Sequence, residues 1–473
     1  MAEPVAFDLP ARLEPADLAG LGVLVAGLRV AGRSVALRLA TFGADVVTCD
    51  DAEIDAAELE AAGVRVHTGG SPAELLEGRQ LLVVAPGLRE RHPLIQAALG
   101  AGVPVWSEVE LGARLARAPM VGVTGTNGKS TTAELAAAML AASGRRTVAA
   151  GNLGLPLIDA VLARQAPEAL VVELSSFQLR FCHRLHLVAG AWLNLAPDHL
   201  DWHGDLTAYA AAKARVWANQ TPSDWSLYAA DDPVVASHAA HAPGNPVPFG
   251  VGRVPPGGLG VEAGIALSRI EGHEGPLWRA AALRLPGRHN LANALAASGL
   301  ALALGAHPAA MTRAVAAFRA SAHRMATLAR VRGVTFVDDS KATNPHAAGR
   351  ALEAFQRVVW IAGGRNKGLA FDELVADVRS RLVGAVLIGE AAGELAAALE
   401  RDGYGGPVVR ATSMGEAVTV AFSLAEPGDT VLLAPACASF DMFSSYAERG
   451  EAFAASVARL AERQEGGVRR APP

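Results

Sequence analysis

The chain has 473 residues, of which 51% are hydrophobic and 19% are charged, so about two to four compact domains are expected. The net charge of −5 gives no basic field for nucleic acid, and no apolar run reaches the ~20 residues of a membrane-spanning helix. Residues 1–15 are acidic and Pro-rich, unlike a signal peptide. The cysteines, Cys49, Cys182 and Cys437, are far apart, which is typical of a reducing cytosol. We expect a cytoplasmic chain.

The first region has the pattern of a βαβ unit that could bind a nucleotide. Its glycine fingerprint is poor, because Arg29 stands where the middle glycine would approach a pyrophosphate. This residue argues against a dinucleotide-dependent oxidoreductase. We expect a Rossmann-like domain over residues 1–117. Its expected strands are 22–26, 44–49, 81–85 and 104–106, and its expected helices are 31–42 and 108–116.

An apolar strand then leads into residues 122–132, Gly-Val-Thr-Gly-Thr-Asn-Gly-Lys-Ser-Thr-Thr. A glycine-rich loop between a strand and a helix lets backbone N–H groups approach phosphate oxygens, and the helix N-terminus adds partial positive charge. Lys129 is expected along the terminal phosphates, with Ser130 or Thr131 on Mg²⁺. Val123 stands where the strict P-loop has its first glycine, so a tight glycine turn is the alternative. The order of strand, loop, Lys-Ser-Thr and helix favours phosphate binding.

Two further strands, at 169–174 and 189–193, end in polar residues. Because ligand sites gather at the carboxyl edge of a parallel sheet, Glu173 is placed to reach the same metal ion. Capping of the following serine turn is its alternative role. Beyond the second strand, His199 is expected near the metal-bound nucleotide. A zinc pair with His203 is less favoured, because the glutamate of His-Glu-x-x-His is missing.

The rest of the central region, expected to end at residue 320, holds fewer signals. Lys213 lies in a helical stretch, 206–220, and taken alone it reads as a solvated surface lysine. Residues 243–287 are rich in Gly and Pro and predict irregular or antiparallel structure. Asn290 and Asn293 share a face at the start of a helix expected to end at residue 304. They could hold an adenine or ribose edge, or cap the helix.

The last region, residues 321–473, predicts a second open α/β sheet with a frayed tail from residue 469. Polar turns follow three of its strands, and we expect them to line one edge of the sheet. Lys341 and Thr343 could bind an anionic substrate group there, and Asp339 a ribose or a metal. Lys367, after a glycine pair, makes a second anion-friendly turn. The expected strands are 335–337, 358–361, 385–388 and 430–433, and the third turn is 434–441.

Together these motifs resemble the Mur ligases, the ATP-dependent amino-acid-adding enzymes of peptidoglycan synthesis. The resemblance covers almost the whole chain. It rests on Thr124 to Ser130, Glu173 with Ser175-Ser176, Asn194 with Asp198-His199, Gly287 to Asn293, and His323-Arg324. The run Asp-Ser-Lys-Ala-Thr-Asn-Pro at 339–345 resembles the branch that adds D-glutamate.

The resemblance implies a three-domain α/β fold. Its parts are the Rossmann-like domain 1–117, a central P-loop-type ATPase domain 118–320 with a mostly parallel sheet, and a C-terminal Rossmann-like domain 321–473. It implies a monomer that joins D-glutamate to UDP-N-acetylmuramoyl-L-alanine through an acyl phosphate, using ATP and two Mg²⁺ ions. A folylpolyglutamate synthase is the alternative, and the run at 339–345 argues against it.

The resemblance also implies roles for single residues. Lys129, His199 and Lys213 are implied to be catalytic, and Lys213 matches the lysine that the family carbamoylates with CO₂. Implied metal ligands are Ser130, Glu173, His199 and Lys213. Implied ATP contacts are Thr124, Gly125, Thr126, Asn127, Gly128, Lys129, Ser130, Thr131, Asn290, Asn293, Arg324 and Asp339. Implied substrate contacts are Asn152, Ser175, Lys341, Thr343, Lys367, Ser439 and Tyr446, the last where the family often has Phe.

Overall fold

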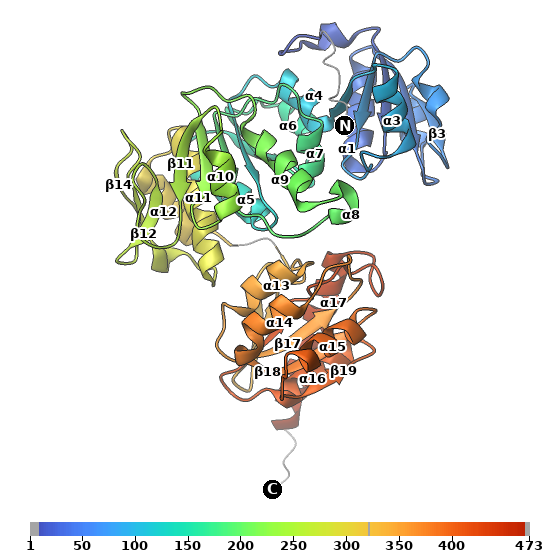
Figure 1. The fold of residues 1–473 in the computed structure, drawn as a ribbon. Helices are drawn as coiled ribbons and strands as arrows, with labels where there is room; N and C mark the ends of the chain where they lie inside the picture. The colour runs from blue at the N-terminus through green and yellow to red at the C-terminus, as the bar shows by residue number, and fades with distance from the viewer. Residues whose placement is uncertain (1–8, 320–321, 469–473) are drawn as a thin grey trace. The chain divides into compact units, whose positions relative to one another are not determined.

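The computed structural model describes residues 9–319 and 322–468, which form three sheets with helices packed on them (Figure 1). The first two sheets belong to one compact unit, and the third sheet belongs to a second. The second unit also includes two short segments, Ala196–His199 and Arg284–Asn290. The domain boundaries drawn from the sequence stay predictions, and both the boundary at residue 320 and the predicted frayed tail lie outside the described residues. Among the described helices, none is long and apolar enough to cross a membrane.

The first sheet is parallel, with strand order β3-β2-β1-β4-β5, as expected for a Rossmann-like domain. All five residues of β1 are buried. This agrees with their small and apolar side chains, which are typical of a parallel strand covered on both faces. The strands are β1 (Gly22–Ala26), β2 (Asp45–Asp50), β3 (Arg65–Thr68), β4 (Leu81–Val84) and β5 (Val105–Ser107). The helices are α1 (Val30–Thr41), α2 (Ala57–Ala61), α3 (Pro93–Gly100) and α4 (Glu108–Leu115).

The second sheet has nine strands in the order β14-β13-β12-β11-β10-β9-β6-β8-β7. It is parallel except at β12 to β14, so the antiparallel structure expected within 243–287 is confirmed. Its strands are β6 (Met120–Thr124), β7 (Thr147–Gly151), β8 (Ala169–Glu173), β9 (Ala189–Trp192), β10 (Trp225–Ala229), β11 (Asn245–Phe249), β12 (Leu259–Glu262), β13 (Ile265–Ser268) and β14 (Gly275–Arg279).

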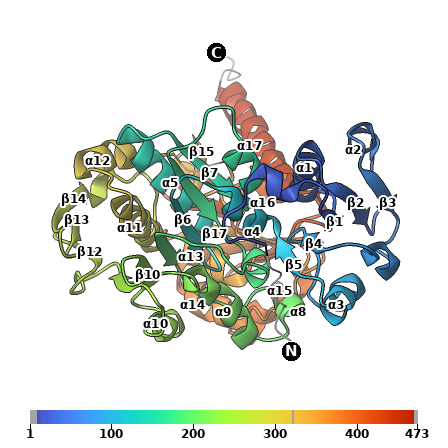
Figure 2. The ribbon, with the colours of Figure 1, turned by 90° about the horizontal axis from the view of Figure 1, so that it is seen from above.

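Helices cover this second sheet, and Figures 1 and 2 show α11 and α12 beside the antiparallel strands. The helices are α5 (Lys129–Ala142), α6 (Leu157–Val161), α7 (Ser176–Arg180), α8 (Leu200–His203), α9 (Leu206–Ala214), α10 (Pro233–Ala239), α11 (Arg288–Ala303) and α12 (Pro308–Ala317). Helix α5 starts at Lys129, the residue expected to open the helical segment. Gly128, at φ 84°, ends the loop in a left-handed conformation and lets the helix begin at once.

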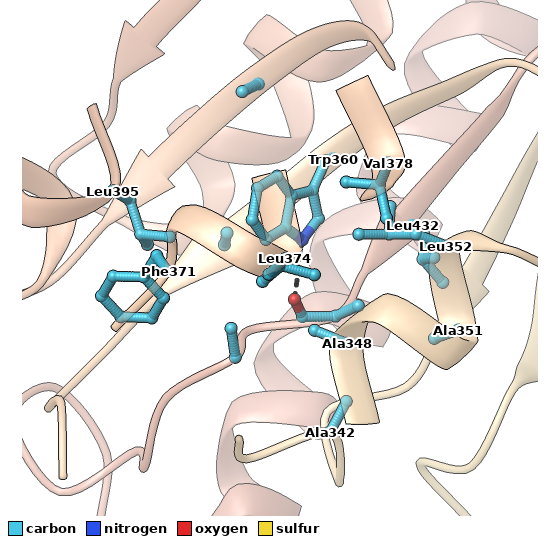
Figure 3. Packing of buried hydrophobic residues seen from close by; sticks show 14 of the residues in the cluster. Ala342, Ala348, Ala351, Leu352, Trp360, Phe371, Leu374, Val378, Leu395 and Leu432 are labelled. Atoms are coloured by element: carbon cyan, nitrogen blue, oxygen red, sulfur yellow. Dashed lines mark hydrogen bonds between the residues drawn. The ribbon is translucent and has the colours of Figure 1, made fainter. Parts of the chain in front are cut away.

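The third sheet has the order β15-β16-β20-β17-β18-β19 and is parallel except for β15. Its core surrounds Trp360, whose indole N–H donates to the Ala434 carbonyl at 2.7 Å (Figure 3). The strands are β15 (Ala326–Val331), β16 (Val334–Asp338), β17 (Val358–Gly363), β18 (Leu382–Ile388), β19 (Val408–Arg410) and β20 (Thr430–Leu433). The helices are α13 (Pro345–Leu352), α14 (Asp372–Val378), α15 (Ala392–Arg401), α16 (Met414–Leu424) and α17 (Tyr446–Val468).

Within the first unit, helix α4 carries two buried carboxylates. Glu110 pairs with Arg114 at 2.7 Å and accepts hydrogen bonds from the backbone N–H groups of residues 183–185. Glu108 accepts a bond from Gln178 through Oε1, while its buried Oε2 has no hydrogen-bond partner. Burial raises the pKa of Glu108 to about 7, against the opposing effect of the Gln178 bond. Glu108 is therefore protonated over a pH range in which its unfolded counterpart is ionised.

We predict that the stability of the Glu108→Gln variant, measured against that of the wild type, increases as the pH rises. The unfolded carboxyl loses its proton near its ordinary pKa of 4.5, and the folded one near a pKa of about 7. Wild-type stability should therefore fall between these pH values, by about 3 kcal/mol in all, whereas the variant has no such group to titrate. Urea unfolding at pH 4 to 8 measures the difference. Glu168→Gln, in an exposed pair with Arg146, is the control, and a gap between variant and wild type that does not change with pH would contradict the prediction.

Candidate active site

The phosphate loop is fixed by side-chain and backbone contacts to the end of β9. The backbone N–H of Asn127 donates to Asn194 Oδ1 at 2.9 Å, and Asn194 Nδ2 donates back to the Asn127 carbonyl at 3.0 Å. The N–H of Thr126 bonds to the Asn194 carbonyl at 3.1 Å. Thr124, which ends β6, is fully buried. The loop is therefore held in shape before any ligand binds.

Two lysines converge on one carbonyl oxygen of this loop. Lys129 Nζ donates to the Gly125 carbonyl at 2.9 Å and to the Thr126 carbonyl at 2.9 Å. Lys213 Nζ donates to the same Gly125 oxygen at 2.7 Å and lies 4.4 Å from the centre of the Tyr209 ring. The reading of Lys213 as a surface residue is wrong, since it is 1% exposed. Helix α9 turns this side chain inward, which a lysine in a short Ala-rich helix does not reveal from sequence.

One of the two predicted asparagines also reaches the loop. A Cβ placed on Gly128 would lie 2.3 Å from Asn293 Oδ1, so the amide of Asn293 rests directly on the loop backbone and only glycine fits there. Asn290 donates from Nδ2 to the Pro286 carbonyl, at 2.6 Å. Its side chain thus ties the start of α11 to the preceding loop.

Glu173 ends β8, where the sequence placed it. Its Oε1 accepts a bond from Asn152 Nδ2 at 2.9 Å, and its buried Oε2 has no hydrogen-bond partner in the structure. An orphaned carboxylate oxygen beside a phosphate-type loop suits a hard cation such as Mg²⁺, which prefers oxygen ligands. Among the described residues, no group of three His, Cys, Asp or Glu side chains gathers as a ready-made metal cage. Phosphate oxygens and water would complete such a Mg²⁺ shell.

Ser175 begins α7 and serves as its cap. Its hydroxyl accepts from the backbone N–H of Gln178 and donates to Gln178 Oε1, at 3.2 and 2.9 Å. Gln178 Nε2 then donates to Glu108 at 3.1 Å. A chain of buried hydrogen bonds thus links the predicted substrate residue Ser175 to helix α4. Sequence reasoning did not include Gln178 or Glu108, although a Ser-x-x-Gln capping box was a readable signal.

In the second unit, the three polar turns after β16, β17 and β20 bond to one another. Ala436 N–H donates to the Ala342 carbonyl at 2.9 Å, and Gly363 N–H to the Pro435 carbonyl at 2.8 Å. Lys341 Nζ lies 3.6 Å from the centre of the Tyr446 ring. In the same turn, the backbone N–H of Thr343 donates to the Lys341 carbonyl at 2.8 Å. Ser439 is buried in the turn after β20. The expected meeting of the three turns at one sheet edge is confirmed.

Acidic residues at the end of β16 hold a strained loop. Asp338 pairs with His323 Nδ1 at 2.6 Å, and Asp339 accepts from the Met325 N–H at 3.1 Å. His323 and Met325, on either side of Arg324, have positive φ angles of 63° and 49°. Burial raises the pKa of Asp339 to about 7, while the Met325 bond and the Arg324 charge oppose this rise.

The remaining predicted residues gather around Asp198, in the segment that belongs to the second unit. Asp198 accepts a bond from Asn344 Nδ2 at 2.9 Å and pairs with Lys367 Nζ at 3.3 Å. Burial acts to raise the pKa of Asp198, but the charges of Lys367 and His199 hold it below the usual value. His199 itself has a φ of 54° and lies 3.6 Å from Asp198. His203, the other half of the alternative zinc pair, bonds to Ser176 Oγ at 2.9 Å.

One compositional signal was overlooked in the sequence. The chain contains only four lysines among its 42 basic residues, namely Lys129, Lys213, Lys341 and Lys367. All four are site residues predicted above. Arginine supplies the other 38 cations. Because an ammonium is a compact charge and its amine can react, the rarity of lysine would have drawn attention to Lys213 without any motif.

Family models match three stretches that together cover most of the chain. These are the MurD-like N-terminal domain of Mur ligases at residues 22–107, the Mur ligase middle domain at 123–301, and the Mur ligase glutamate ligase domain at 323–437.

Curated relatives and solved structures agree with these models. A protein of Frankia casuarinae, named UDP-N-acetylmuramoylalanine–D-glutamate ligase, is 52% identical over 84% of each chain. A Streptomyces coelicolor protein of the same name is 46% identical over 84% of this chain and 88% of its own. The MurF ligase of Thermotoga maritima, solved in complex with ADP, shares the fold at a TM-score of 0.57 and 17% identity, covering 97% of this chain and 100% of its own. The chain therefore belongs to the Mur ligase family.

Proposed function

We propose that this chain is an ATP-dependent ligase that joins D-glutamate to UDP-N-acetylmuramoyl-L-alanine in the synthesis of peptidoglycan precursors. The observation that carries the proposal is the convergence of Lys129 and Lys213 on the Gly125 carbonyl. Lys129, the backbone N–H groups of the loop and the N-terminus of α5 would supply positive charge to a triphosphate, and Lys213 lies beside them on the same oxygen. The names of the relatives supply the substrates, and the cytoplasm, where ATP is available, is the proposed location.

The reaction must activate a carboxylate before an amide can form. An oxygen of the L-alanyl carboxylate attacks the γ-phosphorus of ATP, the bond to the ADP oxygen breaks, and an acyl phosphate forms. The amine of D-glutamate then attacks the acyl carbon, phosphate leaves, and the nitrogen loses a proton. Lys129 neutralises charge on the transferring phosphoryl, and the loop amides hold the phosphates in place.

Ser130 and Glu173 would hold one Mg²⁺ ion, and His199 with a carbamoylated Lys213 a second. When bound, Mg²⁺ supplies further charge neutralisation at the phosphoryl oxygens. The orphaned Glu173 Oε2 supports the first assignment. Thr131 lies beside Ser130 in the first turn of α5, where its backbone would serve the phosphates.

Carbamoylation of Lys213 is supported by its surroundings. The side chain is buried against the ring of Tyr209, and desolvation favours the neutral amine over the ammonium. The neutral Nζ attacks the carbon of CO₂, a nitrogen–carbon bond forms, and one proton is released. The product is a carboxylate-like anion in place of a cation, which is able to face a metal.

The second unit would bind D-glutamate. Lys341, Thr343, Lys367 and Ser439 supply ammonium and hydroxyl groups to two carboxylates, and Tyr446 holds the Lys341 ammonium over its ring. Arg324 and Asp339 would contact ATP from this unit, Asn290 and Asn293 would lie on its adenine side, and Asn152 and Ser175 would contact the UDP-linked substrate. A folylpolyglutamate synthase is the alternative, and folate-dependent phosphate release would favour it.

We predict phosphate release from ATP only when UDP-N-acetylmuramoyl-L-alanine and D-glutamate are both present. L-Glutamate should give less than about one hundredth of the rate, because inversion at the α-carbon removes one charged contact worth a few kcal/mol. Lys341→Ala should abolish D-glutamate-dependent release. Arg146→Ala, at an exposed salt bridge, is the control that should keep it. Turnover by Lys341→Ala at the wild-type rate would refute the pocket assignment.

We also predict that removal of CO₂ lowers turnover and that bicarbonate restores it. A ¹³CO₂-labelled sample should show one protected carbamate ¹³C signal, which Lys213→Arg abolishes together with activity, because arginine cannot be carbamoylated. With only four lysines in the chain, the assignment needs few variants. A signal that persists in Lys213→Arg would assign the carbamate elsewhere.

A further inference from the structure

A buried arginine, which no sequence motif above includes, lies beneath the three turns of the second unit. Arg449, on the first turn of α17, is 1% exposed. Its Nε donates to Ser340 Oγ at 3.0 Å and its Nη2 to the Ser340 carbonyl at 2.9 Å. Its Nη1 donates to the Cys437 carbonyl at 3.1 Å and approaches the Gly363 carbonyl at 3.5 Å. All these acceptors are neutral.

The acceptors lie in three different turns. Ser340 follows β16, Gly363 ends β17, and Cys437 follows β20. A single guanidinium therefore contacts every turn that carries a predicted amino-acid-binding residue. The planar guanidinium has N–H donors on three nitrogen atoms, so it can bond to three separate backbone positions, which the single ammonium nitrogen of lysine cannot do.

The backbone around the Arg449 side chain is tightly packed. A Cβ on Gly364 would lie 3.1 Å from Arg449 Nη1 and 2.1 Å from the Ala438 carbonyl, so glycine is required at that point of the turn. A Cβ on Gly450 would lie 2.0 Å from the ring of His323. The first turn of α17 thus packs closely on both the pocket turns and the loop that holds Arg324.

The same helical turn also orients Lys341. The hydroxyl of Ser340 accepts from Arg449 and donates to the Tyr446 carbonyl at 2.8 Å. The Tyr446 ring, one turn before Arg449, lies under the Lys341 ammonium. Arg449, Ser340, Tyr446 and Lys341 form a continuous set of contacts from the buried core of the second unit to the pocket.

Arg449 stays charged although it is buried. Burial lowers its pKa to about 10, and the nearby carboxylates of Asp441 and Asp338 oppose this fall, so the group is a cation at neutral pH. Among the described residues it forms no direct ion pair with either carboxylate, so its hydrogen bonds go to the three turns.

We propose that Arg449 is the positioning residue of the proposed D-glutamate site, because it fixes the turns that carry Lys341, Lys367 and Ser439. This inference rests on the proposed function and deepens it. Arg449 does not contact the reacting atoms, so its effect should appear in the use of D-glutamate and not in the use of ATP.

The test compares Arg449→Lys, Arg449→Met and Ser340→Ala in the full-length enzyme, with phosphate release as the assay. We expect KM for D-glutamate to rise about tenfold or more in both arginine variants, because hydrogen bonds to a charged group are lost, while KM for ATP changes less than about twofold. Arg449→Lys keeps the charge and should be the milder of the two. Ser340→Ala, a small change suited to a tightly packed site, should raise KM for D-glutamate in the same direction.

Arg357→Met is the matched control. Arg357 pairs with the buried Asp429 at 2.6 Å at the opposite, amino ends of β17 and β20. Its loss should lower the melting temperature without changing KM for D-glutamate. If the Arg449 and Ser340 variants also lose stability but keep the wild-type KM for D-glutamate, Arg449 only stabilises the fold and the inference is wrong. If the wild type itself shows no D-glutamate-dependent release, the proposed function fails first.

Discussion

The carbonyl oxygen of Gly125 is the point on which the first unit's chemistry depends. Two lysine side chains, from the start of α5 and from the end of α9, donate to this one oxygen. Lys129 also donates to the Thr126 carbonyl, and Lys213 lies over the Tyr209 ring, so both side chains are held at this oxygen by neutral groups. A bound polyphosphate would be attracted to an ammonium held there. The proposed carbamoylation of Lys213 would replace one of the two amines by an anion able to face a metal ion.

The second unit meets a different requirement with different means. Three of its turns come from distant parts of the chain and meet at one edge of the sheet. Loops alone are poorly fixed, because few of their backbone groups have regular partners. A buried guanidinium on α17 supplies donors to all three at once. The relative positions of the three turns are therefore set by the first turn of this helix.

Much of this could be predicted from the sequence. Apolar runs bounded by glycine and polar turns placed the expected strands within about three residues, because buried parallel strands are continuous hydrophobic segments. Strand ends then located Glu173 and the three polar turns. Strands β3, β7, β10, β15 and β19 were not predicted.

Contacts between distant segments could not be predicted. Nothing in the local sequence of Asn293 indicates that it rests on Gly128, and Arg449 reads as one more charged residue of a long amphipathic helix. The burial of Lys213 likewise depends on how α9 packs against the loop, which is a property of the tertiary structure. Family resemblance implies a role for Lys213, whereas its helical stretch taken alone suggested a solvated surface position.

The scarcity of lysine has a practical consequence for work with this protein. A lysine-specific protease has only four peptide bonds to cut, and each follows a predicted site residue. Lys129 and Lys213 are held on the loop backbone of the first unit, whereas Lys341 and Lys367 lie in turns of the second unit. The fragments released in a brief digestion therefore report on which unit a ligand shields, without any label or engineered cleavage point.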